Sequence, residues 1–519
     1  MNISSSDKLS QNGVSNTSVH KGGNKRTLFQ YRYLVTFLEF LAFFEINAYR
    51  IATSISVVAM VNSSAVNSHK LSNLTVDSCP INSSNVEGDN ASSEAEGEFD
   101  WSPSVQGNIL GAGFLGYVVT QMLGGLLAER YGAKITIIIG LFLSSLAHIL
   151  SPVAAWTSAN LMIAMQLIRG IGQGLIPAAH CVVAANWFPM IERGLLNSLA
   201  LSGYCVGALV SGFSAGSMCL SSFLGGWPSV YYIYGGLGFL VCLCFQVFFY
   251  ETPKCHPKIK DSELNYILQC QERVLSQKRP PTPWRKILTS VPVYAVTYAI
   301  FAAFWAGAHF LSVHPLFLGA IMHFSIQENG FFTAVPLVIQ MILSNIGGWI
   351  SKCLETRKYV GVDKLRKGFN LLFCVGYSLG LLGVMYAGCD RMLSNILAII
   401  AMGFAGFAYC GCMTAVIDLS PTFAGTVMGL TSTLASTSSF IFPMLVGFMT
   451  NEKQTLEQWN YIFWICIGVT MSSGLIFCVF GSAEIQSWND PPSEEKHKIE
   501  HRTKLQLDPE YQVDIVTHM

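Results

Sequence analysis

An arginine lies inside the first long apolar stretch of the chain, which runs from about Tyr33 to Val61. This residue, Arg50, carries a charge that costs about 2.5–3.5 kcal/mol at the middle of a bilayer, so it is expected to face a polar cavity and to have a partner. Its planar guanidinium group can bind a carboxylate or a phosphate through two parallel hydrogen bonds. Arg50 is therefore our first candidate for anion binding. The alternative is an ion pair with Glu45, which lies about 140° round the same helix.

A second set of polar residues falls in the apolar stretch centred near residue 172. Gln173 and His180 follow Arg169 by four and eleven residues, which places the three side chains within about 40° of one helix face. Together with Gln166 they could line one wall of a cavity and contact the same solute as Arg50. The alternative is a polar seam packed against a neighbouring helix.

Neutral polar residues of other apolar stretches could add hydrogen bonds to a bound solute, although a packed interhelical hydrogen bond is the commoner role of such residues. The candidates are Tyr117, Gln121, His309, Gln340 and Asn345. His314, near the outer end of the seventh apolar stretch, is expected to be solvated.

A short charged turn connects the second and third apolar stretches. Its sequence is Gly124-Gly125-Leu126-Leu127-Ala128-Glu129-Arg130-Tyr131-Gly132-Ala133-Lys134. The glycines permit two helices and their linker to approach closely, and the charged residues lie at the membrane face.

The composition is that of a polytopic membrane protein. Hydrophobic residues make up 51% of the chain, only 12% of the residues are charged, and the mean hydropathy is +0.44, whereas soluble domains carry about 25% charged residues. The net charge is zero and no basic tract is dense enough to predict nucleic-acid binding. The 15 cysteines lie mostly in apolar stretches and are expected to pack rather than to bind a metal. Because no HExxH, GxSxG or P-loop motif is present, we expect no enzyme activity and no cofactor.

Regularly spaced apolar stretches predict an all-α polytopic membrane protein with twelve transmembrane helices. The predicted parts are a disordered cytosolic tail (1–30), an N-terminal six-helix half (31–250), a cytosolic linker (251–287), a C-terminal six-helix half (288–484) and a second cytosolic tail (485–519). Of the 31 Lys and Arg residues, only Lys70, Arg391 and Lys453 fall in loops on the side opposite the tails. The positive-inside rule therefore places both termini in the cytosol.

The two halves repeat each other. The glycine pair at 124–125 corresponds to that at 347–348, and Pro189 corresponds to Pro421 at nearly the same offset. Transporters built from such repeats bind their substrate near the bilayer midplane, between the repeats.

These motifs resemble those of the major facilitator superfamily and, within it, of the anion/cation symporter family, which includes sialin, the vesicular glutamate transporters and the type I sodium-phosphate cotransporters. The charged turn matches the superfamily pattern G-x-L-A-D/E-R-x-G-x-K/R at Gly125, Leu127, Ala128, Glu129, Arg130, Gly132 and Lys134. The likeness to the symporter family rests on the runs Pro177-Ala-Ala-His180, Asn186-Trp-Phe-Pro189, Glu251-Thr-Pro-Lys254, Gln327-Glu-Asn-Gly330, Asp418-Leu-Ser-Pro421 and Ala483-Glu-x-Gln-x-Trp488.

The resemblance implies a major facilitator fold and secondary active transport of a small organic or inorganic anion, such as a sialic-acid-like or glutamate-like carboxylate or phosphate. Transport would be coupled to H⁺ or Na⁺, or driven by the membrane potential. In that family the charged turn holds the inward gate together, and the arginine matching Arg50 is linked to anion binding. We expect a functional monomer in the plasma membrane or in an endolysosomal or vesicle membrane, with the solute and the lipid bilayer as its partners. The alternative is a transport-inactive relative that acts as a sensor or scaffold.

The chain departs from that family in the fourth span. Glutamate transporters and sialin usually read G-E-G-V-T-F/Y-P there, whereas this chain reads Gly172-Gln173-Gly174-Leu175-Ile176-Pro177 and has no carboxylate. This difference weakens an assignment as a glutamate transporter. If protons are coupled, the remaining carrier in this span is His180, because histidine titrates near neutral pH. Glu45 in the first span is the alternative carrier.

The loop from 62 to 101 is expected to be lumenal or extracellular and N-glycosylated, because it carries one lysine and acceptor sequons at Asn62, Asn73, Asn82 and Asn90. Glycosidase treatment should increase the electrophoretic mobility of the wild type, and a variant without these asparagines should migrate like the digested form. Unchanged mobility, together with protease cleavage of the loop from the cytosol, would reverse this topology.

Overall fold

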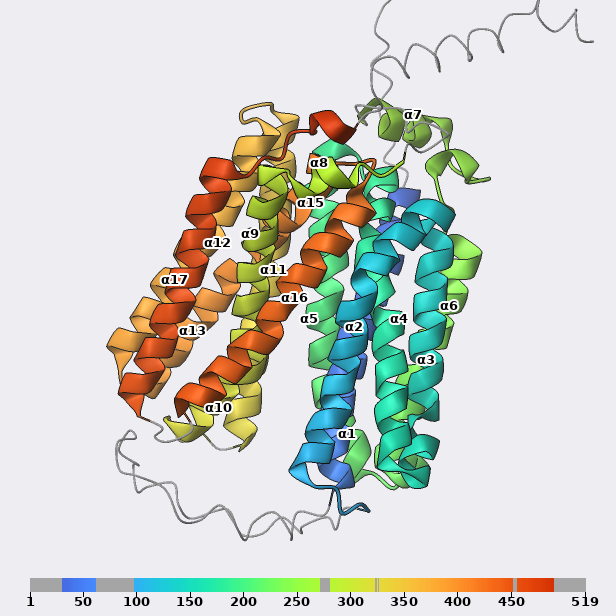
Figure 1. Ribbon diagram of the computed structural model, residues 1–519. Coiled ribbons are helices and arrows are strands. Elements are labelled where there is room, and N and C mark those ends of the chain that lie inside the picture. Colours follow the sequence, from blue (N-terminus) through green and yellow to red (C-terminus); the bar gives the residue numbers. More distant parts are fainter. Residues whose placement is uncertain are drawn as a thin grey trace, which may run out of the picture.

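The computed structural model describes residues 30–61, 98–270, 281–322, 324, 326–450 and 455–489, and the four sequons lie outside these ranges. The described residues form two bundles of helices that lie side by side (Figure 1). The two bundles meet near α7 and α8 and diverge towards α10. We refer to these two ends of the molecule as the α7 end and the α10 end.

Six long helices form the N-terminal half. They are α1 (Tyr31–Met60), α2 (Pro103–Tyr131), α3 (Ala133–Thr157), α4 (Ala159–Trp187), α5 (Arg193–Leu220) and α6 (Trp227–Phe248). Helix α4 packs against α2 and α3, and α1 packs against α5 and α6. Serine side chains cap the amino-terminal ends of α2 and α4, where Ser102 accepts a hydrogen bond from the amide of Val105 and Ser158 accepts one from the amide of Leu161.

The C-terminal half repeats this arrangement with more interruptions. Its helices are α9 (Val291–Ala308), a π-helical turn (His309–Val313), α10 (His314–Ala320), α11 (Ile326–Thr356), α12 (Val362–Ala387), α13 (Arg391–Ala405), α14 (Phe407–Cys410), α15 (Cys412–Leu419), α16 (Ala424–Thr450) and α17 (Leu456–Phe480). The π-helical turn joins α9 to α10, and α13, α14 and α15 together form one span that is interrupted at Gly406 and Gly411. The short helices α7 (Asp261–Cys270) and α8 (Trp284–Leu288) lie between the two halves in the sequence.

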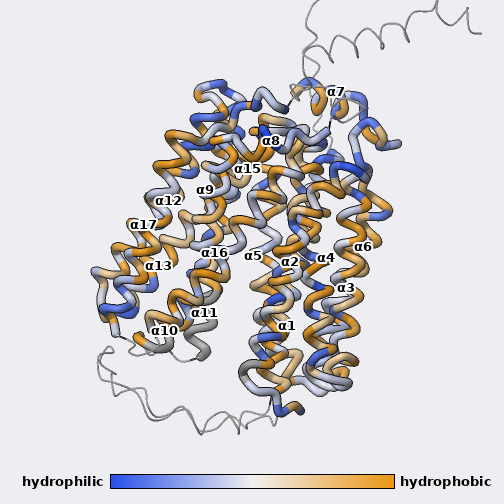
Figure 2. Tube along the Cα trace, in the orientation of Figure 1, coloured by the Kyte–Doolittle hydropathy of each residue, from blue (hydrophilic) through white to orange (hydrophobic). Residues whose placement is uncertain are grey.

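Eleven helical stretches of the described residues are long and apolar enough to cross a membrane. Helix α1 is the twelfth expected span: it has 30 residues but also carries Arg32, Glu39, Glu45 and Arg50, which lower its mean hydropathy. Large apolar side chains are exposed along the helices, as at Leu240 and Leu243 of α6, which are 55% and 59% exposed. Hydrophilic residues gather near α7 and α8 (Figure 2). The predicted all-α fold of twelve membrane helices in two halves is confirmed.

Glycines bring the backbones of α2, α3 and α4 together. A Cβ atom on Gly170 of α4 would overlap the carbonyl oxygen of Gly113 on α2, and one on Gly172 would lie 2.5 Å from the carbonyl oxygen of Gly140 on α3. Small residues at helix contacts are how membrane helices pack closely. This close packing holds the polar residues of α4 against α2 and α1.

Candidate substrate-binding site and gate

Arg50 lies against two aromatic rings of α2. Its guanidinium carbon is 4.2 Å from the centre of the Tyr117 ring and 5.0 Å from the centre of the Phe114 ring. Its Nη2 atom is buried and has no hydrogen-bond partner among the described residues. Glu45, the alternative partner, instead accepts a hydrogen bond from Ser144 Oγ at 2.5 Å. The ion pair between Arg50 and Glu45 is therefore not formed, and the guanidinium group remains free to bind a ligand.

Arg169 is buried in α4 and is oriented by two glutamines of its own helix. Its Nε atom donates to Gln166 Oε1 at 2.7 Å, and its Nη1 atom donates to Gln173 Oε1 at 3.2 Å. Gln173 Nε2 in turn donates to the carbonyl oxygen of Ile46 on α1 at 3.2 Å. The Nη2 atom lies against Gly113 of α2, where it fills the space that a Cβ atom would need. Gln173 thus positions the arginine and also ties α4 to α1.

The two guanidinium groups lie against the same turn of α2, between Gly113 and Tyr117, and they repel each other electrostatically. Within the described part of the chain, neither arginine forms an ion pair with an acidic side chain. Positive charge without a counter-ion is costly in a low-dielectric interior, by several kcal/mol per ion. A carboxylate or phosphate that contacts both groups would remove that cost and accept paired hydrogen bonds. The arrangement therefore favours an anion.

Glu45 and Tyr49 face α3 and α6 rather than Arg50. The Oε2 atom of Glu45 has no hydrogen-bond partner among the described residues. The hydroxyl of Tyr49 lies 3.0 Å from Ser145 Oγ, and its ring stacks on His148 with the ring centres 4.0 Å apart. Both ring nitrogens of His148 are buried without a described partner. Sequence reasoning did not select His148, because one histidine in an apolar run has no informative spacing.

The structure does not place His180 beside the two arginines. Eleven residues along a helix correspond to about 16 Å, so a shared helix face did not mean a shared site. His180 is buried near the α7 end, where Nδ1 lies 3.0 Å from Glu39 Oε2 and Nε2 lies 2.8 Å from Asn197 Oδ1. Sequence reasoning missed both of these partners, which come from α1 and α5.

The neutral candidates divide between the arginine site and helix packing. Tyr117 contacts Arg50, as described above. The others make packing contacts: Gln121 Oε1 accepts from Ser436 Oγ at 3.3 Å, His309 Nδ1 lies 2.9 Å from the Tyr377 hydroxyl, Gln340 Oε1 accepts from Cys205 at 3.7 Å, and Asn345 Nδ2 donates to Ser202 Oγ at 2.8 Å.

The expectation that His314 is solvated was wrong. Its ring is buried, with its centre 5.0 Å from that of Phe310 and 6.3 Å from that of Phe317. It begins α10 directly after the π-helical turn, and these apolar rings exclude it from solvent.

The charged turn joins the two halves at the α7 end. Glu129 accepts hydrogen bonds from the backbone amide of Thr426 at 2.7 Å and from the Thr426 hydroxyl. Gly125 approaches α16 so closely that an added Cβ would overlap the carbonyl oxygen of Gly425. These contacts are made across the interface between α2 and α16.

The remainder of the turn is held within the N-terminal half. Gly132 has φ +105, which a residue with a side chain rarely adopts. Glu251 accepts hydrogen bonds from the amides of Ala133 and Lys134 at 2.8 Å and 2.9 Å, and Lys134 Nζ donates to the carbonyl of Gln246. Arg130 contacts the ring of its neighbour Tyr131 at 5.5 Å.

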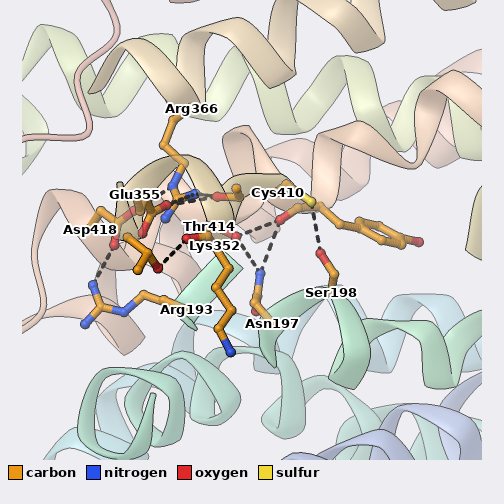
Figure 3. A network of polar contacts seen from close by, with 12 residues as sticks. Arg193, Asn197, Ser198, Lys352, Glu355, Arg366, Cys410, Thr414 and Asp418 are labelled. Carbon is orange, nitrogen blue, oxygen red and sulfur yellow. Dashed lines mark hydrogen bonds and ion pairs between the residues drawn. The ribbon is translucent and has the colours of Figure 1, made fainter. Parts of the chain in front are cut away.

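A network of buried ion pairs, one of which joins the two halves, lies at their interface (Figure 3). Arg193 of α5 donates to Asp418 Oδ1 of α15 at 2.5 Å, and Arg366 of α12 donates to Asp418 Oδ2 at 2.8 Å. Arg366 Nη1 also lies 3.1 Å from Glu355 Oε1 of α11. We call these four residues the inter-half network. Charged residues inside apolar spans are the signal by which Arg366 and Asp418 could have been found.

A second group of charges ties the linker to the same interface. Lys352 Nζ of α11 lies 2.7 Å from Glu192 Oε1, and Arg32 Nε lies 2.8 Å from Glu192 Oε2. Glu263 of α7 accepts hydrogen bonds from the backbone amides of Tyr31 and Arg32, each at 3.1 Å. The start of α1, the linker helix and the C-terminal half therefore meet around Glu192.

The sequence matches the Major Facilitator Superfamily over residues 51–443 and 362–510. It is 30% identical over 481 residues to a putative inorganic phosphate cotransporter of Drosophila melanogaster, covering 90% of this chain and 88% of that protein. It is also 30% identical over 458 residues to sodium-dependent phosphate transport protein 1 of Mus musculus, covering 88% and 95%. Sialin of Homo sapiens is 28% identical over 458 residues, covering 88% and 90%.

Among solved structures, the fold is similar to that of the proton:xylose symporter XylE, with a TM-score of 0.66 at 15% identity over 88% of this chain and 98% of that chain. At this identity the likeness concerns the fold. The match over most of the sequence, together with the arrangement of two six-helix halves, shows that the chain belongs to the major facilitator superfamily, among the relatives of sialin and the sodium-phosphate cotransporters.

Proposed function

We propose that the protein is a secondary active transporter of a small anion and works by alternating access. The observation that carries this proposal is the pair of arginines, Arg50 and Arg169, that lie against one turn of α2 without an acidic partner in the described part of the chain. One relative named as a putative inorganic phosphate cotransporter and another named as a sodium-dependent phosphate transport protein support the same class of solute. The favoured substrates are carboxylates and phosphates, because both can accept paired hydrogen bonds from guanidinium groups.

The α7 end faces the cytosol in this proposal. The supporting observation is charge: Lys and Arg are concentrated in the tails, the linker and the loops at that end, as the positive-inside rule requires. The described conformation, in which the halves meet at the α7 end and diverge towards α10 (Figure 1), is then closed to the cytosol. Transport requires a second conformation in which the inter-half network separates.

Coupling to H⁺ or Na⁺ completes the proposal. No carboxylate occupies the place of the family's span 4 glutamate. The residue there is either Gln173 or a neighbouring glycine, and neither titrates, so a proton carrier has to be found elsewhere. Glu45 is one candidate, because its Oε2 atom is buried without a described partner. No specific observation favours the alternative of a transport-inactive sensor or scaffold, since the arginine pair and the inter-half contacts are both present.

Arg50→Ala should abolish anion uptake while expression stays near normal, because the variant loses paired hydrogen bonds to the anion rather than a structural ion pair. Arg50→Lys should restore little activity, since an ammonium group cannot reproduce the planar fork of donors. The measurement is uptake of radiolabelled phosphate, sialic acid and glutamate into proteoliposomes. A suitable control is Arg391→Ala at the α10 end, and wild-type uptake by Arg50→Ala would contradict the assignment.

Asp418→Asn should favour separation of the halves at the α7 end. Removing one partner of a buried charge pair destabilises the joined state by roughly 2–5 kcal/mol, because Arg193 remains buried there. The separated state avoids this cost, since Arg193 becomes hydrated when the halves part. Spin labels attached through non-cysteine residues at Tyr131 and Tyr359, which are 60% and 69% exposed, would report this as a longer distance.

Asp390→Asn is the matched control for Asp418→Asn. Asp390 caps the start of α13 by accepting hydrogen bonds from the amides of Met392 and Leu393, and asparagine caps a helix equally well. A distance in Asp418→Asn equal to that in the control would show that the network does not hold the halves together.

A further inference from the structure

A buried histidine–carboxylate pair lies beside the interface of the two halves. Glu39 of α1 and His180 of α4 are 0% and 2% exposed, and His180 Nδ1 lies 3.0 Å from Glu39 Oε2. The other ring nitrogen, Nε2, lies 2.8 Å from Oδ1 of Asn197, which is 1% exposed. Both sides of the imidazole therefore have a hydrogen-bond partner, and the identity of those partners determines where its hydrogens are.

The orientation of the Asn197 amide is fixed by the C-terminal half. Its Nδ2 atom donates to Thr414 Oγ1 of α15 at 2.9 Å and to the carbonyl oxygen of Tyr409 of α14 at 3.3 Å. A backbone carbonyl can only accept, so the nitrogen of the amide has to point towards Tyr409. Its oxygen then points towards His180, and Nε2 of the imidazole must carry a hydrogen in order to donate to it (Figure 3 shows Asn197 and Thr414).

With a hydrogen on Nε2, the contact between His180 and Glu39 needs one more proton. A neutral imidazole that is protonated on Nε2 has an unprotonated Nδ1, which would face an ionised carboxylate at 3.0 Å as one acceptor against another. The contact becomes a hydrogen bond when one proton lies between the two atoms, either on Nδ1 as an imidazolium or on Glu39 as a carboxylic acid. We propose that Glu39 and His180 form a proton-binding dyad that is loaded when the two halves are joined at the α7 end.

Separation of the halves removes the need for this proton. Asn197 then loses its hydrogen bonds to Thr414 and Tyr409, so its side-chain amide is free to rotate. Once the amide has rotated, Nε2 of His180 no longer has to donate a hydrogen bond. A neutral imidazole protonated on Nδ1 alone can donate to the Glu39 carboxylate, so one proton leaves the dyad for the solvent at the α7 end. Because the joined state holds one proton more than the separated state, low pH favours the joined state by linkage.

Other titratable and charged groups lie near the dyad. They are Glu129 on α2, Cys181 on α4, Arg193 and Tyr204 on α5, Arg366 on α12, Tyr409 on α14 and Asp418 on α15. Within the inter-half network the two arginines are neutralised by Asp418 and Glu355, and Glu129 is bound to Thr426. Within the described residues, none of these groups makes a hydrogen bond to Glu39 or His180 that would replace the proton.

This inference rests on the proposed transport function, because it makes the dyad the group that couples a proton to the conformational cycle. Its conformational test needs no substrate. The distance between spin labels at Tyr131 and Tyr359 is measured in nanodiscs from about pH 5 to about pH 8, where histidine titrates. In the wild type, raising the pH should shift the population towards the separated state, by at most tenfold in the equilibrium constant per pH unit for one linked proton.

Glu39→Gln and His180→Gln should each remove this pH dependence. In Glu39→Gln the new side-chain amide can donate to Nδ1 of His180 without an added proton, and in His180→Gln the imidazole that shares the proton is absent. His314→Gln is the matched control, since it replaces another buried histidine, one in the C-terminal half, and it should keep the wild-type pH dependence. If the label distance still depends on pH in both dyad variants, the proposal is overturned. If this pH dependence disappears only in Glu45→Gln, the proton is assigned to Glu45 instead.

A transport measurement distinguishes failure of the dyad from failure of the proposed function. With radiolabelled phosphate, sialic acid and glutamate in proteoliposomes, the dyad variants should retain counterflow exchange at equal pH and lose accumulation driven by a pH gradient. Accumulation that remains in both variants contradicts the dyad. Absence of counterflow for every anion in the wild type contradicts the proposed function, while the label distances still test proton binding.

Discussion

Charge inside a membrane requires a compensating charge, and this requirement explains how the polar residues of the protein are distributed. Arg193 and Arg366 satisfy it by pairing with Asp418 and Glu355, and the pair of Arg193 with Asp418 joins the two halves. Arg50 and Arg169 do not satisfy it within the described part of the chain, because glutamines and aromatic rings surround them. The same physical cost that makes the first group a structural contact is the reason why we propose the second group as a binding site for an anion.

Glu39 and His180 lie between these two cases. Their pair is neutral when it holds the additional proton, so it can be buried without a further counter-ion. Asn197 connects this pair to the C-terminal half through Thr414 and Tyr409. Separation of the halves thus alters the hydrogen bonds of the dyad through the side-chain amide of Asn197 alone. No charged side chain has to move across the membrane.

The sequence predicted the fold well because each membrane helix is encoded locally. Long apolar runs, the glycine at position 132 and the offset between repeated glycines and prolines all follow from properties of short segments. Arg50 was identified for the same reason, since an arginine in an apolar run is conspicuous without any knowledge of its neighbours. The expectation that Arg169 and Gln173 share a face was also local, and they do lie together in the structure.

Contacts between helices could not be predicted in this way. His180 was grouped with Arg169 by its angle around α4, but the structure pairs it with Glu39, 141 residues away in the sequence. His314 is likewise buried against the rings of Phe310 and Phe317, and these contacts do not follow from its position near the end of an apolar run. An angle around one helix specifies a direction, whereas the partner in that direction is determined by how the helices are arranged.

The inter-half network has a composition that suits an interface which has to open repeatedly. Asp418 is bonded by Arg366 of its own half as well as by Arg193 of the other half. When the halves part, the carboxylate keeps one arginine and is not left as an unpaired buried charge. Arg193 becomes hydrated at the newly exposed surface, which offsets its lost ion pair. The loss of this ion pair is therefore partly compensated in the separated state, which brings the free energies of the joined and separated states closer together.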